Sequence, residues 1–261
     1  MELRGEPADI VALDRAAVLE SVRLVGEARP GDWRRPTPCD RWTLRELVAH
    51  MAAQHHAFAT AARGEGAGAR AERGERAGAT AERGERAGAT AERGERAGAT
   101  AERGERAGAA ARRPPDPWDD PAGAYRSAAG TVLDAFARPG TTDRPFVLPE
   151  ISARTVPGHR AIGFHFIDYV VHAWDVAATL GLRVLLPEPV LRAALPIALA
   201  VPGGEARRAP DSAFRPALPP DPGRRSAPSA GEPTGSDGSG TLSLILTCLG
   251  RHPGWTPPDT R

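Results

Sequence analysis

The fold is decided by residues 161–180, which read AIGFHFIDYVVHAWDVAATL. Apolar side chains cover most sides of the helix that this stretch predicts, and such a helix is buried inside a protein. At about 100° per residue, one narrow arc of the helix carries polar residues instead: His165, Asp168, His172, Asp175 and Thr179. A buried polar stripe must have its hydrogen bonds and charges satisfied internally. A bound metal ion is one economical way to satisfy them.

A second helix-forming stretch, residues 36–51, reads PTPCDRWTLRELVAHM. It contains the signature of a helix start, with Thr43 as N-cap and Glu46 three residues later forming a capping box. We therefore predict a helix over residues 44–62. His50 lies at the edge of its apolar stripe, where a packed neighbouring helix could meet its imidazole.

Asp168 and His172 are four residues apart, so both side chains lean over the same helical turn and can share one ion. A third ligand must come from another helix, and His50 is the candidate. Two other interpretations stay open, because a lone histidine is more often a core or surface residue and an Asp–His pair can be a buried ion pair. The pattern predicts a metal site formed by His50, Asp168 and His172.

The other polar residues near these ligands have simpler interpretations. Cys39 is expected to be a packed small thiol, because no histidine accompanies it in the sequence to make it a nucleophile. His165 is expected to support a ligand through a hydrogen bond, with a role as fourth ligand as the alternative. Asp175 is placed to orient His172. Three further side chains are not expected to bind the metal. His55 is expected near the apolar face of its helix, His56 on the outward side, and Trp174 in the core.

Apolar residues at helical spacing predict further helices, which complete an all-α four-helix bundle with additions. These segments are residues 8–28, 122–137 and 189–201. Pro196 lies within the last of them and is expected to kink or split it. Residues 144–160 predict an irregular crossover with at most a minor strand. A short apolar helix over residues 242–250 is expected to dock back on the bundle.

Two stretches are expected to be long disordered insertions. Residues 64–113 contain the repeated decapeptide AERGERAGAT, whose apolar side chains are all alanine. Stacking such repeats would bury too little surface to offset a chain entropy of about 1–2 kcal/mol per residue, so we predict a low-complexity linker. Residues 202–240 are rich in Pro, Gly, Ser and Arg, which predicts a flexible loop. One metal-binding bundle, formed by residues 1–63 and 114–255, remains.

Composition narrows the class of partner. The chain has 34 basic and 33 acidic residues and a formal net charge of +1, so no overall field attracts it to nucleic acid or to an anionic membrane. Two cysteines are too few for a disulfide framework. The first residues are charged throughout, and no stretch of about eighteen apolar residues could cross a bilayer. We expect a cytoplasmic monomer or homodimer.

Three segments resemble one known family: PTPCDRWTLRELVAHM at 36–51, VVHAWDVAATLG at 170–181 and LGRHPGW at 249–255. They resemble the actinobacterial metal-binding proteins related to mycothiol-dependent maleylpyruvate isomerase, in the DinB-like four-helix-bundle superfamily. The similarity covers about residues 8–63 and 118–255. It implies one ligand at His50 and two, at i and i+4, at Asp168 and His172. The isomerase-like members carry glutamate where this chain has Asp168.

The resemblance implies a divalent-metal-binding protein, with zinc as the favoured ion and mycothiol as a co-substrate. Such an enzyme would use the thiol to isomerise a small electrophile or to conjugate with it, because a metal-coordinated thiol is deprotonated outright. One alternative is a non-catalytic metal-binding or stress-response bundle, whose structural ion would be enclosed by four protein ligands. Another is a member of the family that binds no metal.

Overall fold

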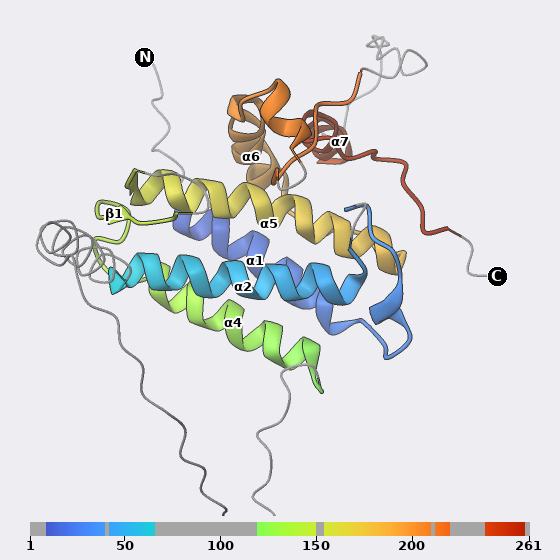
Figure 1. The fold of residues 1–261 in the computed structure, drawn as a ribbon, viewed down its shortest axis with the longest axis horizontal. Helices are drawn as coiled ribbons and strands as arrows, with labels where there is room; N and C mark the ends of the chain where they lie inside the picture. Colours follow the sequence, from blue (N-terminus) through green and yellow to red (C-terminus); the bar gives the residue numbers. More distant parts are fainter. Residues whose placement is uncertain are drawn as a thin grey trace, which may run out of the picture.

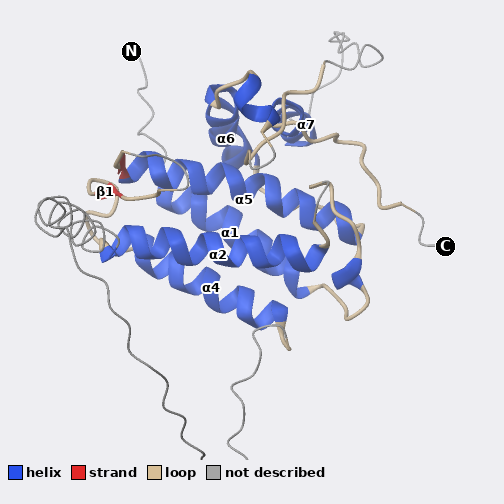
Figure 2. Cartoon of the chain, viewed as in Figure 1, coloured by secondary structure: helices blue, strands red, loops and turns tan. Residues whose placement is uncertain are grey.

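The structure is a computed structural model, and it describes residues 9–39, 42–65, 119–149, 154–209, 212–219 and 238–258. Within these ranges the chain forms helices and one two-stranded sheet, so the predicted all-α class is confirmed (Figure 2). The predicted linker at 64–113 lies, except for its first two residues, outside the described residues. None of the described helices is both long and apolar enough to cross a membrane.

Four long helices form the bundle: α1 (Ile10–Gly26), α2 (Leu44–Arg63), α4 (Pro121–Phe136) and α5 (Gly158–Leu180). A short 3-10 turn, η1 (Asp32–Arg34), lies between α1 and α2. Helix α1 packs chiefly on α5, and α2 packs chiefly on α4 (Figure 1). Contacts of α1 with α4 and of α2 with α5 close the bundle. The helix that carries His50 is therefore next to the helix that carries Asp168 and His172.

Helices α2 and α4 run in the same direction along the bundle (Figure 1). The ring of His55, in the middle of α2, lies 5.3 Å from that of Tyr125, which is in the first half of α4. Further along α2, the ring of Phe58 lies 6.5 Å from that of Phe136, the last residue of α4. The end of α2 and the start of α4 therefore lie at opposite ends of the bundle.

The predicted start of α2 is confirmed in detail. The Thr43 hydroxyl accepts a hydrogen bond from the backbone N–H of Glu46, and the Glu46 carboxylate accepts one from the backbone N–H of Thr43 at 2.8 Å. The helix ends at Gly64, whose φ of 77° lies in the left-handed region that favours glycine. Because α2 begins and ends at fixed residues, the side of the helix on which His50 lies is fixed as well.

Helix α5 begins three residues before the predicted position. Just before it, the strands β1 (Pro145–Phe146) and β2 (Val156–Pro157) pair in antiparallel fashion. This short sheet is the minor strand structure predicted in the crossover. A Cβ atom on Gly158 would lie 2.2 Å from the carbonyl oxygen of Thr141, so only glycine fits at the first position of the helix. The helix ends at Gly181 (φ 69°), as predicted.

Two additional helices, α6 (Glu188–Ala200) and α7 (Gly238–Cys248), pack on each other along the α5 side of the bundle (Figure 1). Helix α6 is continuous through Pro196, so the predicted splitting does not occur. Helix α7 begins four residues earlier than predicted. The predicted docking of the C-terminal helix is confirmed, because Ile245 and Leu246 of α7, and Leu249 directly after it, join the main core.

Part of the segment predicted as a flexible loop, residues 202–240, is described and is packed against α7. It contains the 3-10 turn η2 (Glu205–Arg208). The buried guanidinium of Arg207 donates hydrogen bonds to the carbonyl oxygens of Pro202 and Cys248 at 2.8 and 2.7 Å. An arginine that satisfies several backbone carbonyls can order a segment that composition alone predicts to be mobile.

Candidate metal centre

The structure brings together the three side chains that the sequence predicts as metal ligands. His50 on α2 and Asp168 and His172 on α5 each offer a ligand atom, and these atoms lie within 4.8 Å of one another. Nε2 of His172 is 3.4 Å from Oδ1 of Asp168, and the rings of His50 and His172 meet nearly edge-on with centroids 5.7 Å apart. Two imidazoles and a carboxylate form a donor set found in catalytic zinc sites.

The spacing fits an ion after a small adjustment of the side chains. Two ligand atoms that each lie about 2.1 Å from one zinc ion are at most about 4.2 Å apart. Asp168 has a side chain that is 20% exposed and can move, whereas that of His172 is only 3% exposed. The arrangement therefore fits a divalent ion that draws Asp168 and His50 toward a fixed His172.

Asp175 fixes the ring of His172. Its Oδ2 atom lies 2.9 Å from Nδ1 of His172, so Nε2 is the nitrogen left to face Asp168 and His50. A carboxylate on the far nitrogen of a ligating histidine is a common feature of metal sites, where it sets the ring orientation. Burial by itself lowers the pKa of His172, but the charges of Asp168 and Asp175 raise it above its ordinary value.

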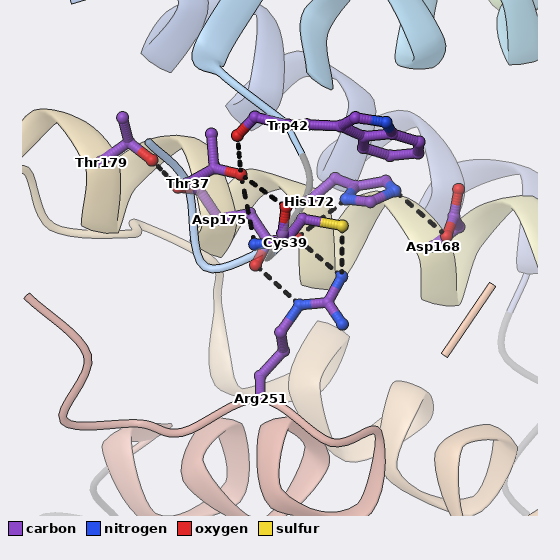
Figure 3. Close-up of polar contacts among 8 residues, drawn as sticks. All are labelled: Thr37, Cys39, Trp42, Asp168, His172, Asp175, Thr179 and Arg251. Atoms are coloured by element: carbon purple, nitrogen blue, oxygen red, sulfur yellow. Dashed lines mark hydrogen bonds and ion pairs between the residues drawn. The ribbon is translucent and has the colours of Figure 1, made fainter. Parts of the chain in front are cut away.

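Arg251, in the tail that follows α7, compensates the buried charge of Asp175 (Figure 3). Its side chain is 3% exposed, and its Nε and Nη2 atoms donate to the two carboxylate oxygens of Asp175 at 2.9 and 3.1 Å. Burial alone would raise the pKa of Asp175, but Arg251 and His172 hold it below its usual range. Arg251 does not stand out in the sequence, since arginine is abundant throughout the chain and only the terminal LGRHPGW segment marks its position.

His50 is held by an aromatic neighbour. The ring of Trp42, just before α2, lies 4.5 Å from that of His50. Burial lowers the pKa of His50, and the nearby His172 lowers it further, against the opposing effect of Asp168. A neutral imidazole is the form that binds a metal, so this environment prepares His50 as a ligand.

The structure does not bring His165 or His55 into the centre. Nδ1 of His165 lies 2.6 Å from Oδ1 of Asp14, and its Nε2 lies 3.1 Å from Nδ1 of His55. These three buried side chains form a separate cluster, so the expected support of a ligand by His165 is wrong. Asp175 takes that place. The structural residues lie as predicted, with His56 exposed and Trp174 in the core.

A cavity of about 1370 Å³ opens beside the ligands. His50, Asp168 and His172 line one part of it, and apolar side chains from α5, α6 and the segment after η2 line much of the rest. These include Phe164, Ile167, Ile197 and Phe214. Cys39, which is half-buried, also lines the cavity. An ion bound here would have free space on its cavity side for exogenous ligands.

Known proteins share part of this chain. The family described as the mycothiol maleylpyruvate isomerase N-terminal domain matches residues 15–177, which contain all three candidate ligands and Asp175 but not Arg251. Two curated relatives are uncharacterised proteins of Mycobacterium tuberculosis, from strains CDC 1551 / Oshkosh and ATCC 25618 / H37Rv. Each is 38% identical over 68 residues, which are 26% of this chain and 36% of the relative. No solved structure gave a significant match.

Proposed function

Because this chain belongs to the mycothiol maleylpyruvate isomerase N-terminal domain family, we propose that it is a metal-dependent enzyme that activates a low-molecular-weight thiol. One observation carries the proposal. The ligand atoms of His50, Asp168 and His172 lie within 4.8 Å of one another at the wall of a cavity of about 1370 Å³. A catalytic ion needs an open position, and the cavity provides the room for one.

Each residue of the centre has a distinct role in this proposal. His50, Asp168 and His172 would hold a divalent ion, with zinc favoured by the donor set, and a bound zinc supplies the positive charge that keeps a thiol deprotonated. Asp175 keeps Nε2 of His172 directed at the site. The thiol that the family implies is mycothiol, and its thiolate would attack a small electrophile to isomerise it or to form a conjugate.

The apolar walls of the cavity serve this chemistry. Phe164, Ile167 and Ile197 come from α5 and α6 and line the cavity, and with a substrate bound they would limit the water near the ligands. A thiolate is a stronger nucleophile when less water solvates it, so these walls favour attack on a bound electrophile over exchange with solvent. The positive charge of Arg251 is compensated by Asp175, so it adds little net charge at the floor of the cavity.

The experiment is elemental analysis of purified protein, followed by cobalt substitution. We expect His50→Ala and His172→Ala to abolish stoichiometric metal binding and Asp168→Asn to weaken it by removing the charge. His56→Ala is the matched control, because this exposed histidine of α2 should not alter the metal content. A thiol such as cysteine or mycothiol should change the visible spectrum of the cobalt form. Equal metal in wild type and His50→Ala would exclude the three-ligand centre.

The alternative of a structural ion makes a different prediction for the same cobalt sample. A structural ion would be enclosed by four protein ligands, and its spectrum would not respond to added thiol. His165, the expected alternative for a fourth ligand, hydrogen-bonds to His55 and Asp14 instead. The geometry of the described residues therefore favours an ion with an open position. Metal analysis of wild type also decides whether the chain is a member that binds no metal.

A further inference from the structure

Three segments that hold the candidate centre meet at the guanidinium of Arg251 (Figure 3). Its two hydrogen bonds to Asp175 reach α5, at 2.9 and 3.1 Å. Its Nη2 atom also lies 3.4 Å from Sγ of Cys39, in the loop that precedes α2. Arg251 itself belongs to the tail after α7. A single buried cation therefore links the C-terminal tail to α5 and to the loop that precedes α2.

The first link acts on His172. Asp175 can fix Nδ1 of His172 only while its carboxylate is itself held, and Arg251 holds both of its oxygens in a fork. Without that fork, the Asp175 carboxylate would be a buried charge that lacks its main compensation, and it would move or take up a proton. Either change would release the ring of His172.

The second link acts on His50 through the loop before α2. The backbone N–H of Cys39 donates to the hydroxyl of Thr37 at 3.2 Å, and that hydroxyl donates to the carbonyl oxygen of Trp42 at 2.9 Å. The ring of Trp42 in turn packs on the ring of His50, with centroids 4.5 Å apart. A contact that holds Cys39 therefore helps to hold the aromatic neighbour of His50.

The tail is built to deliver Arg251 to this position. The backbone N–H of Arg251 donates to the carbonyl oxygen of Leu246 at 2.8 Å, which ties it to the end of α7. Gly250 has a φ of 76°, and a Cβ atom there would lie 2.7 Å from the carbonyl oxygen of Arg215, so only glycine allows this turn. The side chain is fixed before any ion arrives.

We propose that Arg251 is a positioning residue of the metal centre, which makes the centre complete only when the C-terminal tail is docked. The inference rests on the proposed function, because it assumes that His50 and His172 are ligands. It goes beyond the family match, since Arg251 lies outside residues 15–177. Arginine is required rather than lysine, because only a planar fork contacts both oxygens of Asp175 and the Cys39 sulfur together.

The test compares two buried arginines of the C-terminal part. Arg207 is 6% exposed and holds backbone carbonyls near α7, and it does not line the cavity. Arg251→Met should lower the affinity for Co²⁺ by about 10- to 100-fold, the usual effect of losing an outer partner of a ligating histidine. Arg207→Met should lose thermal stability but keep its Co²⁺ affinity. Equal losses of affinity in both variants would make Arg251 a general packing residue and overturn the proposal.

Two further measurements keep the test decisive. Arg251→Lys retains the charge, so it should fold even if Arg251→Met does not, and we expect its Co²⁺ affinity to be reduced. Wild-type affinity in Arg251→Lys would contradict the need for a fork. In metal-free protein, ¹⁵N spectra of the His172 ring, at a pH where it is neutral, should show one tautomer in wild type and a mixture in the Arg251 variants. If wild type binds no metal, the proposed function fails, but a single tautomer in every variant is what would refute the positioning role.

Discussion

The ring of His172 has a carboxylate near each nitrogen, and this arrangement decides how protons compete with a metal. Asp175 lies 2.9 Å from Nδ1, and Asp168 lies 3.4 Å from Nε2. Despite the opposing effect of burial, these charges raise the pKa of His172 above 6.5 in the metal-free protein. At His50 burial lowers the pKa below 6.5. The two imidazoles should therefore lose their protons at different pH values.

We expect metal affinity to fall in two stages as the pH is lowered. The first stage begins above pH 6.5, when the raised pKa of His172 is crossed. Because the ion must then displace one proton, affinity falls about tenfold per pH unit. The fall becomes steeper only below the lowered pKa of His50. Competition with a chelator over this range measures the profile, and His56→Ala should reproduce it. An affinity that stays constant through the first stage would show that His172 is not a ligand.

The three candidate ligands could be predicted because helical spacing is visible in a sequence. The i, i+4 relation of Asp168 and His172 requires only that α5 be a helix, and the capping box at Thr43 fixes the phase of His50. The partner of His165 could not be predicted, because Asp14 is 151 residues away and only the packing of α1 on α5 brings it close. Arg251 was missed for the same reason, since 76 residues separate it from Asp175.

At the scale of elements, a row of three buried polar side chains joins three of the four bundle helices. Asp14 on α1, His165 on α5 and His55 on α2 are at most 1% exposed, and they are linked by contacts of 2.6 and 3.1 Å. The rings of His165 and His55 also stack on Tyr169. Oδ2 of Asp14 and Nε2 of His55 have no hydrogen-bond partner among the described residues, so the two contacts within the cluster are the ones that favour this arrangement of the helices. The cluster therefore fixes the register of α1, α2 and α5.

This cluster should make stability depend on pH. Burial lowers the pKa of His55 well below 6.5, and the neighbouring His165 lowers it further, so the unfolded chain takes up a proton that the folded chain cannot. The contribution of His55 is thus present above pH 6.5 and is lost as the pH falls toward its lowered pKa, at up to about 1.4 kcal/mol per pH unit.

The measurement is urea denaturation between about pH 7.5 and pH 5.5, the range in which a free histidine gains its proton. His55→Gln keeps an amide that can bond to His165 but cannot be protonated, so its free energy of unfolding should fall less steeply than that of wild type. His56→Gln, on the exposed side of α2, is the control and should follow wild type. Parallel profiles for His55→Gln and wild type would mean that His55 is not held neutral in the folded state.

Local chemistry predicts helix ends well only where the end is made locally. The capping box of α2 and the end of α5 at residue 180 are made by local residues, and both were predicted. The start of α5 was not, because Gly158 is placed by the carbonyl of Thr141 from a preceding loop. Helix α7 starts at Gly238, within a Gly- and Ser-rich stretch of poor helix propensity. Packing of α7 on α6 overrides that propensity.

At the scale of the whole molecule, the sequence predicts which segments are helical but not how they are arranged. Periodicity gives each helix a buried face without naming its partner, so the pairing of α6 with α7 on the α5 side had to come from the structure. The same holds for the parallel course of α2 and α4, which is shown by the ring contacts of His55 with Tyr125 and of Phe58 with Phe136. This parallel course limits how far the connection between α2 and α4 can be shortened.

The two ends that this connection joins are separated by at least the length of α4, which has 16 residues and is therefore about 24 Å long at about 1.5 Å per residue. Deleting residues 71–100, three copies of the decapeptide, leaves a connection with ample reach. The decapeptides offer no apolar stripe, and halving a loop changes its closure entropy by only about 0.6 kcal/mol, so stability and metal affinity should hardly change.

Deleting residues 66–116 is the matched comparison, because it leaves six residues between α2 and α4. Six intervening residues allow seven extended steps of at most about 3.6 Å, or roughly 25 Å. The path is longer than this, because it covers the length of α4 and also the five residues of α2 that follow Phe58, about 7 Å more. This variant should lose more than about 2 kcal/mol of unfolding free energy, a loss typical of strained or disrupted structure. Both variants can be compared with wild type by urea denaturation and by metal content. A similar loss in the 71–100 deletion would show that the repeats pack on the bundle, whereas no loss in the shorter-linked variant would contradict the parallel course of α2 and α4.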